Sequence, residues 1–301
     1  MSDIALSTMW AIGRFANLAD FFTAGRNLGF TRFELNHAIN SDMLDGLSLN
    51  GCISSVHEPC PADISTGTLK AKNWLISAPD EEDRQRGVAA TKRSIDLAHR
   101  LGASAVIVHP GRVDIDEGME SRLVGLHNAG KSGQPEYVEA KERLVAARTA
   151  QAEVNMRSVR RSLLELAEYA APLGVRLSLE NRFHYFEIPQ PDELDELLSL
   201  GCGDVVAYWH DVGHAEVLQR LGFRPHEEWL QRFSERMVGI HLHDVAGITD
   251  HLAAGLGDVD WDMVFRHVPD GALQTCEFLS SNSPEQVSTG LHRLLELRQR
   301  G

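Results

Sequence analysis

The sequence predicts an α/β fold, a closed (β/α)8 barrel of parallel strands and surrounding helices, and two observations carry this prediction. Short runs of bulky apolar residues alternate with stretches of helical spacing along the 301 residues. Such alternation is typical of a parallel sheet whose strands are joined by helices. Eight strand-like runs can be counted, which is the number that closes such a barrel. We therefore expect one domain over residues 1–301.

The candidate strands share bulky or β-branched residues and stand between turn-forming residues. In chain order they are IALSTM (4–9), TRFELN (31–36), ISSVHE (53–58), SAVIVHP (104–110), VRLSLEN (175–181), DVVAYWHD (204–211), MVGIHLHD (237–244) and LQTCEFL (273–279). Among the stretches between them and after the last one, residues 82–102 and 283–299 have clear helical spacing. The weakest unit is the second, where SDMLDGLSL forms a short helix at best.

One segment after the fourth strand departs from the repeat. Residues 110–134 are polar and rich in glycine, which predicts a loop longer than is usual inside a compact domain. A helical pattern follows over residues 135–172, and a helix of that length spans roughly 50 Å. We expect its first part to project over the strand ends. A lid, a contact in a homo-oligomer and a solvated hairpin are three alternative roles for residues 110–157.

Charge and composition narrow the class of protein. The net charge of −14 repels polyanions and argues against nucleic acid or an anionic membrane as the partner. The first residues, MSDIALSTMW, do not have the pattern of a signal peptide, and no apolar run reaches the roughly 18 residues that span a bilayer. The four cysteines lack CxxC spacing, as in reduced cytosolic proteins. We expect a cytoplasmic protein with a small-molecule partner.

Ionisable side chains stand at the carboxyl ends of strands three to eight. They are His57, His109, Glu180, Asp211, His241 with His243, and Glu277. In a barrel these ends form the face on which active sites are built. Because side chains alternate along a strand, Asp211 is expected to face the site with Trp209, and His210 to point away. So many acidic groups and imidazoles at one mouth predict a bound cation, and this mixture suits Mn²⁺, Zn²⁺ or Co²⁺ better than Ca²⁺.

The same residues carry a resemblance to a known family. In this order, "VHEP", "VIVHPG", "LENR", "HDVGHA", "HLHDVAG", "DHLAAGLGDVDW" and "CEF" resemble the xylose isomerase-like TIM-barrel superfamily, which includes sugar phosphate isomerases and epimerases and endonuclease IV. For the epimerase branch, the resemblance implies one divalent ion held by Glu180, Asp211, His241 and Glu277. It also implies that the two glutamates are the acid–base pair and that His214 touches the substrate.

The endonuclease IV branch uses three zinc ions, and the resemblance extends toward that larger set. His57, His109, His214 and His251 fall on the further ligand positions. Thr249 stands where that branch usually has an aspartate, and Asp250 comes one residue late. One ion is therefore expected, and up to three can be accommodated by the histidines present.

Further residues have two interpretations each. Arg182, in "ENRFHYFEIP", either binds a substrate carboxylate or phosphate or forms a salt bridge at the barrel rim. His57 and His109 are the other candidate contacts for the substrate. His243 is expected to fix the ring of His241, as metal-bound imidazoles commonly need. His37 and His226 are interpreted as solvated or structural.

The function expected from the sequence is a metal-dependent isomerase or epimerase of a small sugar, polyol or hydroxy-ketone. Glu180 and Glu277 would transfer protons through an enediolate. A multi-zinc phosphodiesterase similar to endonuclease IV is the alternative from another class. A dehydratase of the same superfamily is a closer variant.

Overall fold

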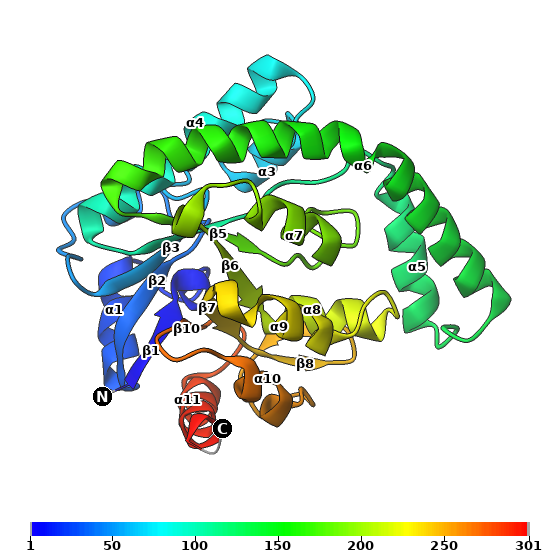
Figure 1. The fold of residues 1–301 in the computed structure, drawn as a ribbon. Helices are drawn as coiled ribbons and strands as arrows, with labels where there is room; N and C mark the ends of the chain where they lie inside the picture. Colours follow the sequence, from blue (N-terminus) through cyan, green and yellow to red (C-terminus); the bar gives the residue numbers. More distant parts are fainter. Residues whose placement is uncertain (1, 300–301) are drawn as a thin grey trace.

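Eight parallel strands close into a barrel in the computed structural model, which describes residues 2–299 (Figure 1). Around the barrel the order is β1, β2, β3, β4, β5, β6, β7 and β10, and β10 pairs with β1. The strands are β1 Ser2–Ser7, β2 Phe30–Leu35, β3 Ile53–His57, β4 Ala105–Val108, β5 Arg176–Glu180, β6 Val206–Asp211, β7 Met237–Leu242 and β10 Leu273–Cys276. The predicted (β/α)8 barrel is confirmed, with its eight strands in the predicted segments.

Helices surround the barrel on the outside (Figure 1). The α-helices are α1 Leu18–Asn27, α2 Ser41–Leu44, α3 Thr66–Ala71, α4 Glu81–Leu101, α5 Gly118–Asn128, α6 Pro135–Ala170, α7 Pro191–Leu198, α8 Val212–Arg220, α9 His226–Phe233, α10 Trp261–His267 and α11 Pro284–Arg298. Short 3-10 helices are η1 Thr8–Ala11, η2 Ala171–Leu173, η3 Gly203–Val205 and η4 Ser234–Arg236. As predicted, the second unit contains only the single turn of α2.

Local signals explain where the predicted helices begin and end. The side chain of Asp80 accepts hydrogen bonds from two backbone N–H groups in the first turn of α4, and Gly102 ends that helix with a φ of 72°. Ser283 and Gln286 form a capping box at the start of α11, with Pro284 in its first turn. These helices match the predicted segments 82–102 and 283–299 closely.

The core has an outer and an inner part because side chains alternate along each strand. In β4, Val106 and Val108 pack toward the helices, whereas Ala105 and Ile107 face the barrel axis with Trp209 of β6. The indole of Trp209 fills the space beside Gly239 of β7, where an added Cβ would lie 2.0 Å from the ring. Trp209 thus plugs the barrel interior, and polar side chains occupy the layer above it.

The predicted loop over residues 110–134 is wrong in part, because α5 forms within it. Glycines interrupt the apolar spacing of this segment, so its local sequence does not predict a helix. Leu123 of α5 is nevertheless fully buried against Tyr137, Ala140 and Leu144 of α6. Tertiary packing against α6 therefore stabilises a helix that the local sequence does not favour.

The long helix α6 is confirmed, and its first part forms a hairpin with α5 beside the barrel (Figure 1). This α5–α6 hairpin is attached to the segment that follows β5. Glu120 of α5 accepts a hydrogen bond from the backbone of Tyr185 at 3.1 Å. Arg148 of α6 donates to both carboxylate oxygens of Glu193, at 2.8 and 2.7 Å. The hairpin is therefore docked on the barrel rather than standing free in solvent.

A small antiparallel hairpin follows β7 and was not predicted. It consists of β8 Asp244–Ala246 and β9 Thr249–Leu252. Asp244 stabilises the loop after this hairpin, since its carboxylate accepts hydrogen bonds from the backbone of Gly255 at 2.7 Å and of Val259 at 3.1 Å. The β8–β9 hairpin carries Asp250 and His251 toward the barrel mouth.

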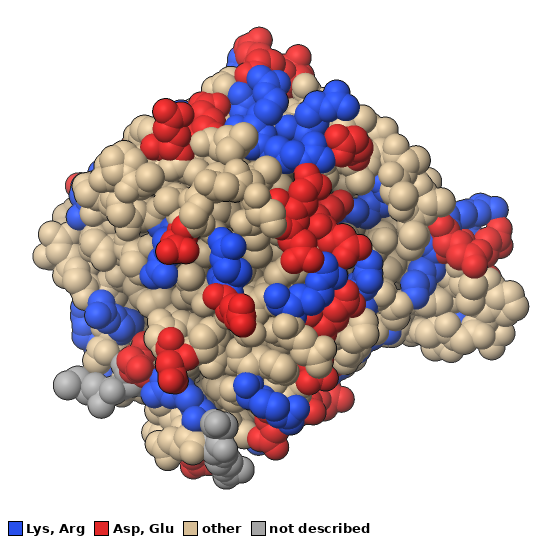
Figure 2. All heavy atoms as spheres, in the orientation of Figure 1, with Lys and Arg blue, Asp and Glu red and all other residues tan. Residues whose placement is uncertain are grey.

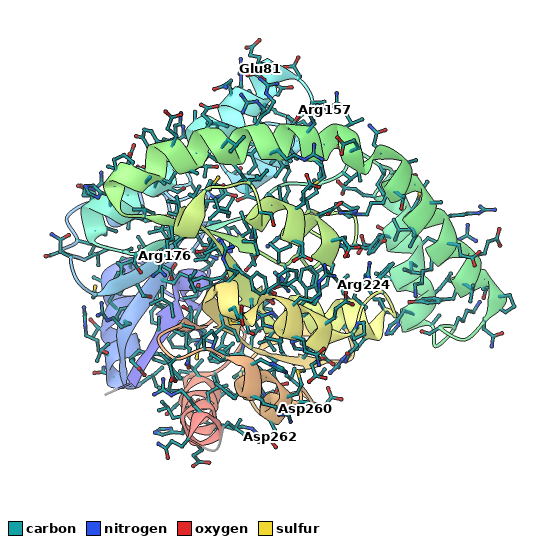
Figure 3. The ribbon with its side chains drawn as sticks, viewed as in Figure 1. Glu81, Arg157, Arg176, Arg224, Asp260 and Asp262 are labelled. Atoms are coloured by element: carbon teal, nitrogen blue, oxygen red, sulfur yellow. The ribbon has the colours of Figure 1, made fainter. Side chains whose placement is uncertain are left out.

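The surface mixes charges of both signs. On the face shown in Figure 2, Lys and Arg side chains are interspersed with Asp and Glu side chains. Figure 3 shows the same view with side chains drawn, including Arg176 at the start of β5 and Arg224 before α9. Within residues 2–299, no helix combines the length and the hydropathy that crossing a membrane requires.

Candidate active site at the carboxyl end of the barrel

Four neighbouring strands deliver four candidate ligands to one point. Glu180 and Asp211 are the last residues of β5 and β6, His241 lies one position before the end of β7, and Glu277 directly follows β10. Strand register brings His241 level with Asp211 on one side and with Thr275 on the other. Because all the strands are parallel, their carboxyl ends meet at the same mouth, as the sequence predicts.

The ring of His241 is the centre of this group, and its Nδ1 faces three carboxylates. Nδ1 lies 2.8 Å from Glu180 Oε1, 3.1 Å from Glu277 Oε2 and 3.4 Å from Asp211 Oδ2. One atom of each of the four residues lies within 4.8 Å of the others, and all four side chains are buried. A single N–H can donate a strong hydrogen bond to one of these oxygens only, whereas a divalent cation can be shared by all of them.

The electrostatics of the four residues show what such a cation would replace. Burial by itself would lower the pKa of His241, but the negative charges of Glu277 and Glu34 raise it well above its ordinary value. Burial likewise opposes ionisation of Glu277, while the positive charge of His241 and a hydrogen bond from His251 hold its pKa below the usual range. A protonated His241 thus balances part of the negative charge. A divalent ion bound at Nδ1 would take the place of that proton, so the donor set fits Mn²⁺, Zn²⁺ or Co²⁺.

Glu34 at the carboxyl end of β2 is a site residue that the sequence interpretation missed. Both of its oxygens lie 3.2 Å from Nε2 of His241, and Ser55 Oγ donates to Glu34 Oε2 at 2.8 Å. A carboxylate on the second nitrogen fixes the ring orientation of a metal-binding histidine. The signal was present in TRFELN, because Glu34 is an ionisable residue at a strand end like those on strands three to eight.

The expected role of His243 as the partner of His241 is wrong. Its Nε2 lies 3.0 and 3.1 Å from the two oxygens of Asp211, and its Nδ1 accepts a hydrogen bond from the backbone N–H of His251 at 2.9 Å. His243 and His241 alternate with Leu242, as predicted, but their rings diverge at the mouth. His243 therefore orients Asp211, while Glu34 orients His241.

A second group of possible ligands adjoins the first at Glu180. His109 Nε2 lies 2.9 Å from Glu180 Oε2, and His57 Nε2 lies 3.9 Å from Glu180 Oε1. One ligand atom from each of these three residues lies within 4.8 Å of the others. His37, interpreted from the sequence as solvated or structural, lies with its ring 5.1 Å from that of His57. Burial, with a smaller contribution from the charge of His57, lowers the pKa of His37 to about 3.

A third group contains His214, Asp250 and His251, again with ligand atoms within 4.8 Å of one another. Asp250 Oδ2 lies 3.0 Å from His251 Nδ1 although the two residues are adjacent. Consecutive side chains of a regular strand point to opposite faces. His251 departs from this alternation because it has a φ of 55°. The shift of the aspartate to position 250, which the sequence suggested would weaken this group, is accommodated by that backbone conformation.

Arg182 and His210 both lie where the sequence predicted. For Arg182, the position agrees with the salt-bridge interpretation. Arg182 is buried, donates from Nη1 to Glu180 Oε2, and has its Nε 3.4 Å from Glu187 Oε2. It therefore forms a salt bridge at the rim, and that salt bridge reaches a candidate metal ligand. The ring of His210 contacts Tyr208 and His226 on the outside of the barrel, so it points away from the mouth as predicted.

The two glutamates at the mouth are not equivalent. Both oxygens of Glu180 have partners, since Oε1 faces His241 and Oε2 faces His109 and Arg182. In Glu277, Oε2 faces His241, but the buried Oε1 has no hydrogen-bond partner among residues 2–299. Unpartnered buried oxygens are rare in folded proteins and often mark a functional group. Among the oxygens of these two glutamates, Glu277 Oε1 is thus the one left without a partner by residues 2–299.

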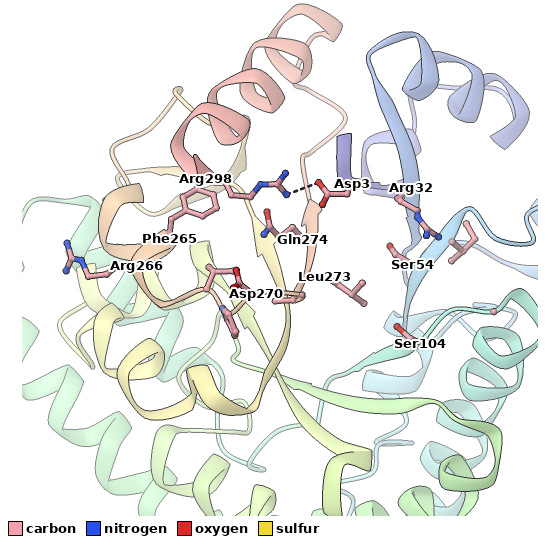
Figure 4. A pocket seen from close by; sticks show the side chains of 16 residues that line it. Asp3, Arg32, Ser54, Ser104, Phe265, Arg266, Asp270, Leu273, Gln274 and Arg298 are labelled. Atoms are coloured by element: carbon pink, nitrogen blue, oxygen red, sulfur yellow. Dashed lines mark hydrogen bonds and ion pairs between the residues drawn. The ribbon is translucent and has the colours of Figure 1, made fainter. Parts of the chain in front are cut away.

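A separate cavity of about 680 Å³ lies at the other end of the barrel (Figure 4). Its lining includes Arg32, Ser54 and Leu273, which stand near the beginnings of their strands. In Figure 4, Asp3 and Arg298 are joined across it by an ion pair of 2.7 Å. The ligand-type residues converge on the carboxyl ends instead, so the candidate active site is at that mouth.

Comparison with known proteins agrees with this architecture. The family described as xylose isomerase-like TIM barrel matches residues 53–297. A D-tagatose 3-epimerase-like protein has 17% sequence identity and a TM-score of 0.67, covering 99% of this chain and 98% of that one. The 3-keto-D-glucoside 4-epimerase YcjR from E. coli has 13% identity and a TM-score of 0.67, covering 98% and 100%. At these identities the likeness shows the fold.

Two further matches belong to this comparison. The IolI protein, whose structure contains a bound zinc atom, has 14% identity and a TM-score of 0.66, covering 99% of this chain and 98% of that one. The uncharacterized protein y4fM of Sinorhizobium fredii is 25% identical over 205 residues, which are 65% of this chain and 52% of that protein. The chain thus spans about half the length of that curated relative.

Proposed function

Because the chain belongs to the xylose isomerase-like TIM barrel family, we propose that it is a metal-dependent isomerase or epimerase of a small sugar, polyol or hydroxy-ketone. The observation that carries the proposal is the single ring nitrogen of His241 facing three buried carboxylates. The names of the similar structures, among them tagatose, ribulose and 3-keto-glucoside epimerases, support a carbohydrate-like substrate.

Glu180, Asp211, His241 and Glu277 are the proposed metal ligands. A bound Mn²⁺, Zn²⁺ or Co²⁺ would withdraw electron density from a carbonyl or hydroxyl oxygen and so acidify the neighbouring C–H bond. Glu34 holds the imidazole of His241 in place, and His243 holds the carboxylate of Asp211 in place. The zinc atom bound in the structure of the similar IolI protein supports this class of cofactor.

Glu180 and Glu277 are the proposed proton-transfer pair. Removal of a proton from the carbon next to the carbonyl leaves the electron pair of that C–H bond in an enediolate. Return of a proton to carbon completes the isomerisation or epimerisation. Glu277 Oε1, which has no partner within residues 2–299, is the proposed acceptor of the first proton. His57, His109 and His214 border the same space and are proposed to contact the substrate, while Arg182 acts there through Glu180.

A multi-zinc phosphodiesterase is the second candidate, and a specific observation favours it. Two groups next to the proposed metal site each have ligand atoms within 4.8 Å of one another. One group is His57, His109 and Glu180, and the other is His214, Asp250 and His251. Three ions bound there would suit a metal-generated hydroxide that attacks a phosphodiester. The net charge of −14 opposes binding to a nucleic-acid backbone, so the isomerase remains the first proposal. A dehydratase would use the same proton-removing group to eliminate water.

Two assays on the same protein separate the isomerase from the phosphodiesterase. The metal-loaded protein is incubated with ketoses and inososes in D₂O, and NMR detects deuterium entering next to the carbonyl. The proposal expects deuterium incorporation with at least one of these substrates and no incision of an abasic DNA duplex at low salt. Efficient incision of the duplex, lost in a Glu277→Gln variant, would assign the chain to the phosphodiesterases instead.

A further inference from the structure

A continuous series of buried polar groups lies on the outer side of β6, behind the candidate metal site. The hydroxyl of Tyr208 lies 2.7 Å from His210 Nδ1, and His210 Nε2 lies 3.0 Å from His226 Nε2. His226 Nδ1 in turn lies 3.0 Å from Glu216 Oε2. Tyr208, His210 and His226 are fully buried, and Glu216 is nearly so. We call these four residues the histidine chain; the mechanism above does not use them.

At its inner end the histidine chain reaches Asp211 through Asn181. The side-chain oxygen of Asn181 accepts a hydrogen bond from the backbone N–H of Asp211 at 2.8 Å, and its amide group donates to the backbone carbonyl of Asp211 at 2.8 Å. The hydroxyl of Tyr208 also lies 2.9 Å from that oxygen. Asn181 therefore holds the backbone of Asp211 from both sides, and Tyr208 holds Asn181.

Hydrogen-bond directions along the chain follow from this arrangement. Asn181 Oδ1 can only accept, so Tyr208 spends its one proton on it. His210 Nδ1 must then carry a proton and donate to the Tyr208 oxygen. The two Nε2 atoms share one further proton, and His226 Nδ1 shares another with Glu216.

His226 bridges the ring of His210 and the carboxylate of Glu216. Its Nδ1 faces the Glu216 carboxylate at 3.0 Å, whereas His210 faces only the phenol and the other ring. Burial raises the pKa of Glu216, but hydrogen bonds from His226 and from Arg220 outweigh it and keep that pKa low. Arg220 Nε lies 2.8 Å from Glu216 and also donates to the backbone carbonyl of Gly247 at 2.8 Å. The chain thus ends in an ion pair that also touches the β8–β9 hairpin.

We propose that the histidine chain positions Asp211 for metal binding. Glu216 and His226 fix the ring of His210, and His210 fixes the backbone of Asp211 through Tyr208 and Asn181. The inference rests on the proposed function, since it takes Asp211 as a metal ligand. A network that served the fold alone would change stability when broken. A positioning network also changes metal affinity at temperatures where the protein stays folded.

The test compares two tyrosine variants that each lose one buried hydroxyl. Tyr208→Phe breaks the link between Asn181 and His210. Tyr137→Phe is the matched control, because the Tyr137 hydroxyl donates to the Leu221 backbone at 2.9 Å between α6 and the end of α8, away from Asn181. Zn²⁺ and Mn²⁺ dissociation constants are measured by chelator competition well below the unfolding temperature. Loss of such outer contacts typically weakens metal binding about 10- to 100-fold. We expect a loss of about tenfold or more for Tyr208→Phe and little change for Tyr137→Phe.

A second measurement on the unaltered protein keeps the inference testable if Tyr208→Phe does not fold. Nitrogen-15 NMR near neutral pH reports the protonation of each histidine ring. We expect His210 to carry its proton on Nδ1, because that nitrogen donates to the Tyr208 hydroxyl. Equal metal affinities for the two tyrosine variants, or a His210 ring with its proton on Nε2 alone, would overturn the inference while leaving the proposed function standing. A wild-type protein that binds neither ion would instead overturn the proposed function, and the inference with it.

Discussion

Arg182 and Glu180, two positions apart at the end of β5, are joined by a hydrogen bond from the guanidinium Nη1 to Oε2 in the protein interior. Side chains two positions apart on an extended chain lie on the same side, which makes the contact possible. The guanidinium also faces Glu187, whose carboxylate lies 3.3 Å from Lys70. Arg182 thus connects a candidate metal ligand to charges at the rim.

The Arg182→Met variant is expected to be strongly destabilised. Removing the guanidinium leaves two buried carboxylates, Glu180 and Glu187, without their shared partner, which typically costs about 3–5 kcal/mol. Arg224→Met is the control, because the Arg224 side chain is 38% exposed and its ion pairs are long, at 3.5 and 3.8 Å. Exposed pairs contribute about 1 kcal/mol or less. Urea unfolding measures both variants, and equal losses would show that Arg182 is not a structural anchor of Glu180.

The Glu277→Gln variant is expected to lose proton exchange while keeping most of its metal. Glutamine retains one ligating oxygen but removes the free Oε1 base, so exchange of the substrate proton with D₂O should fall about 10²- to 10⁴-fold. Glu285→Gln, an exposed change at the start of α11, serves as the control and should retain full exchange. Unchanged exchange in metal-loaded Glu277→Gln would remove Glu277 from the mechanism.

The attachment of the α5–α6 hairpin should depend on pH through His184. Burial alone would lower the pKa of His184, but a hydrogen bond to Glu120 and the charge of Glu187 raise it above its ordinary value of 6.5. A raised pKa in the folded state means that protonated His184 stabilises the attachment below about pH 6.5, and that this contribution disappears as the pH rises through the higher folded-state value.

The measurement is hydrogen exchange of α5 amides in the wild type and in His184→Gln. We expect α5 to be better protected in the wild type at a pH of about 6, and the difference between the two proteins to vanish about two units higher. A difference that is constant over this range would mean that the charge of His184 does not hold the hairpin.

Leu123→Ala should loosen the same hairpin through packing. Leu123 is fully buried against Tyr137, Ala140 and Leu144, and truncation of such a leucine typically costs about 2–5 kcal/mol. Leu164→Ala, at an exposed position on α6, is the matched control. Faster hydrogen exchange over residues 118–144 in Leu123→Ala, with unchanged metal content, is the expected result. Loss of bound metal in this variant would show that the hairpin supports the site directly.

Much of the fold follows from local patterns, and the misses share a physical cause. The eight strands and the helices α4, α6 and α11 carry their own periodicity or capping residues, so they can be predicted from the sequence. The helix α5 forms because Leu123 packs on α6, a contact that no local pattern records. Likewise, the β8–β9 hairpin depends on contacts of Asp244 with residues eleven and fifteen positions away.

The residues at the ends of recognised strands were predicted to meet, whereas residues on loops and on irregular segments were mostly missed. Glu180, Asp211, His241 and Glu277 meet as expected because ends of parallel strands share one face. Glu34 obeys the same rule but lies outside the motifs that carry the family resemblance. His37 and Asp250 lie on loops or on an irregular hairpin, so strand alternation does not predict where their side chains point.

The central claim is that Glu180, Asp211, His241 and Glu277 hold a divalent metal ion, and metal analysis of protein purified without chelators tests it most directly. The wild type should contain about one equivalent or more of Mn, Co or Zn, and His241→Gln should lose it because Nδ1 faces all three carboxylates. His292→Gln, an exposed histidine on α11, should keep the wild-type content. Less than about a tenth of an equivalent in the wild type, with no gain in thermal stability on adding Mn²⁺, Co²⁺ or Zn²⁺, would contradict the claim.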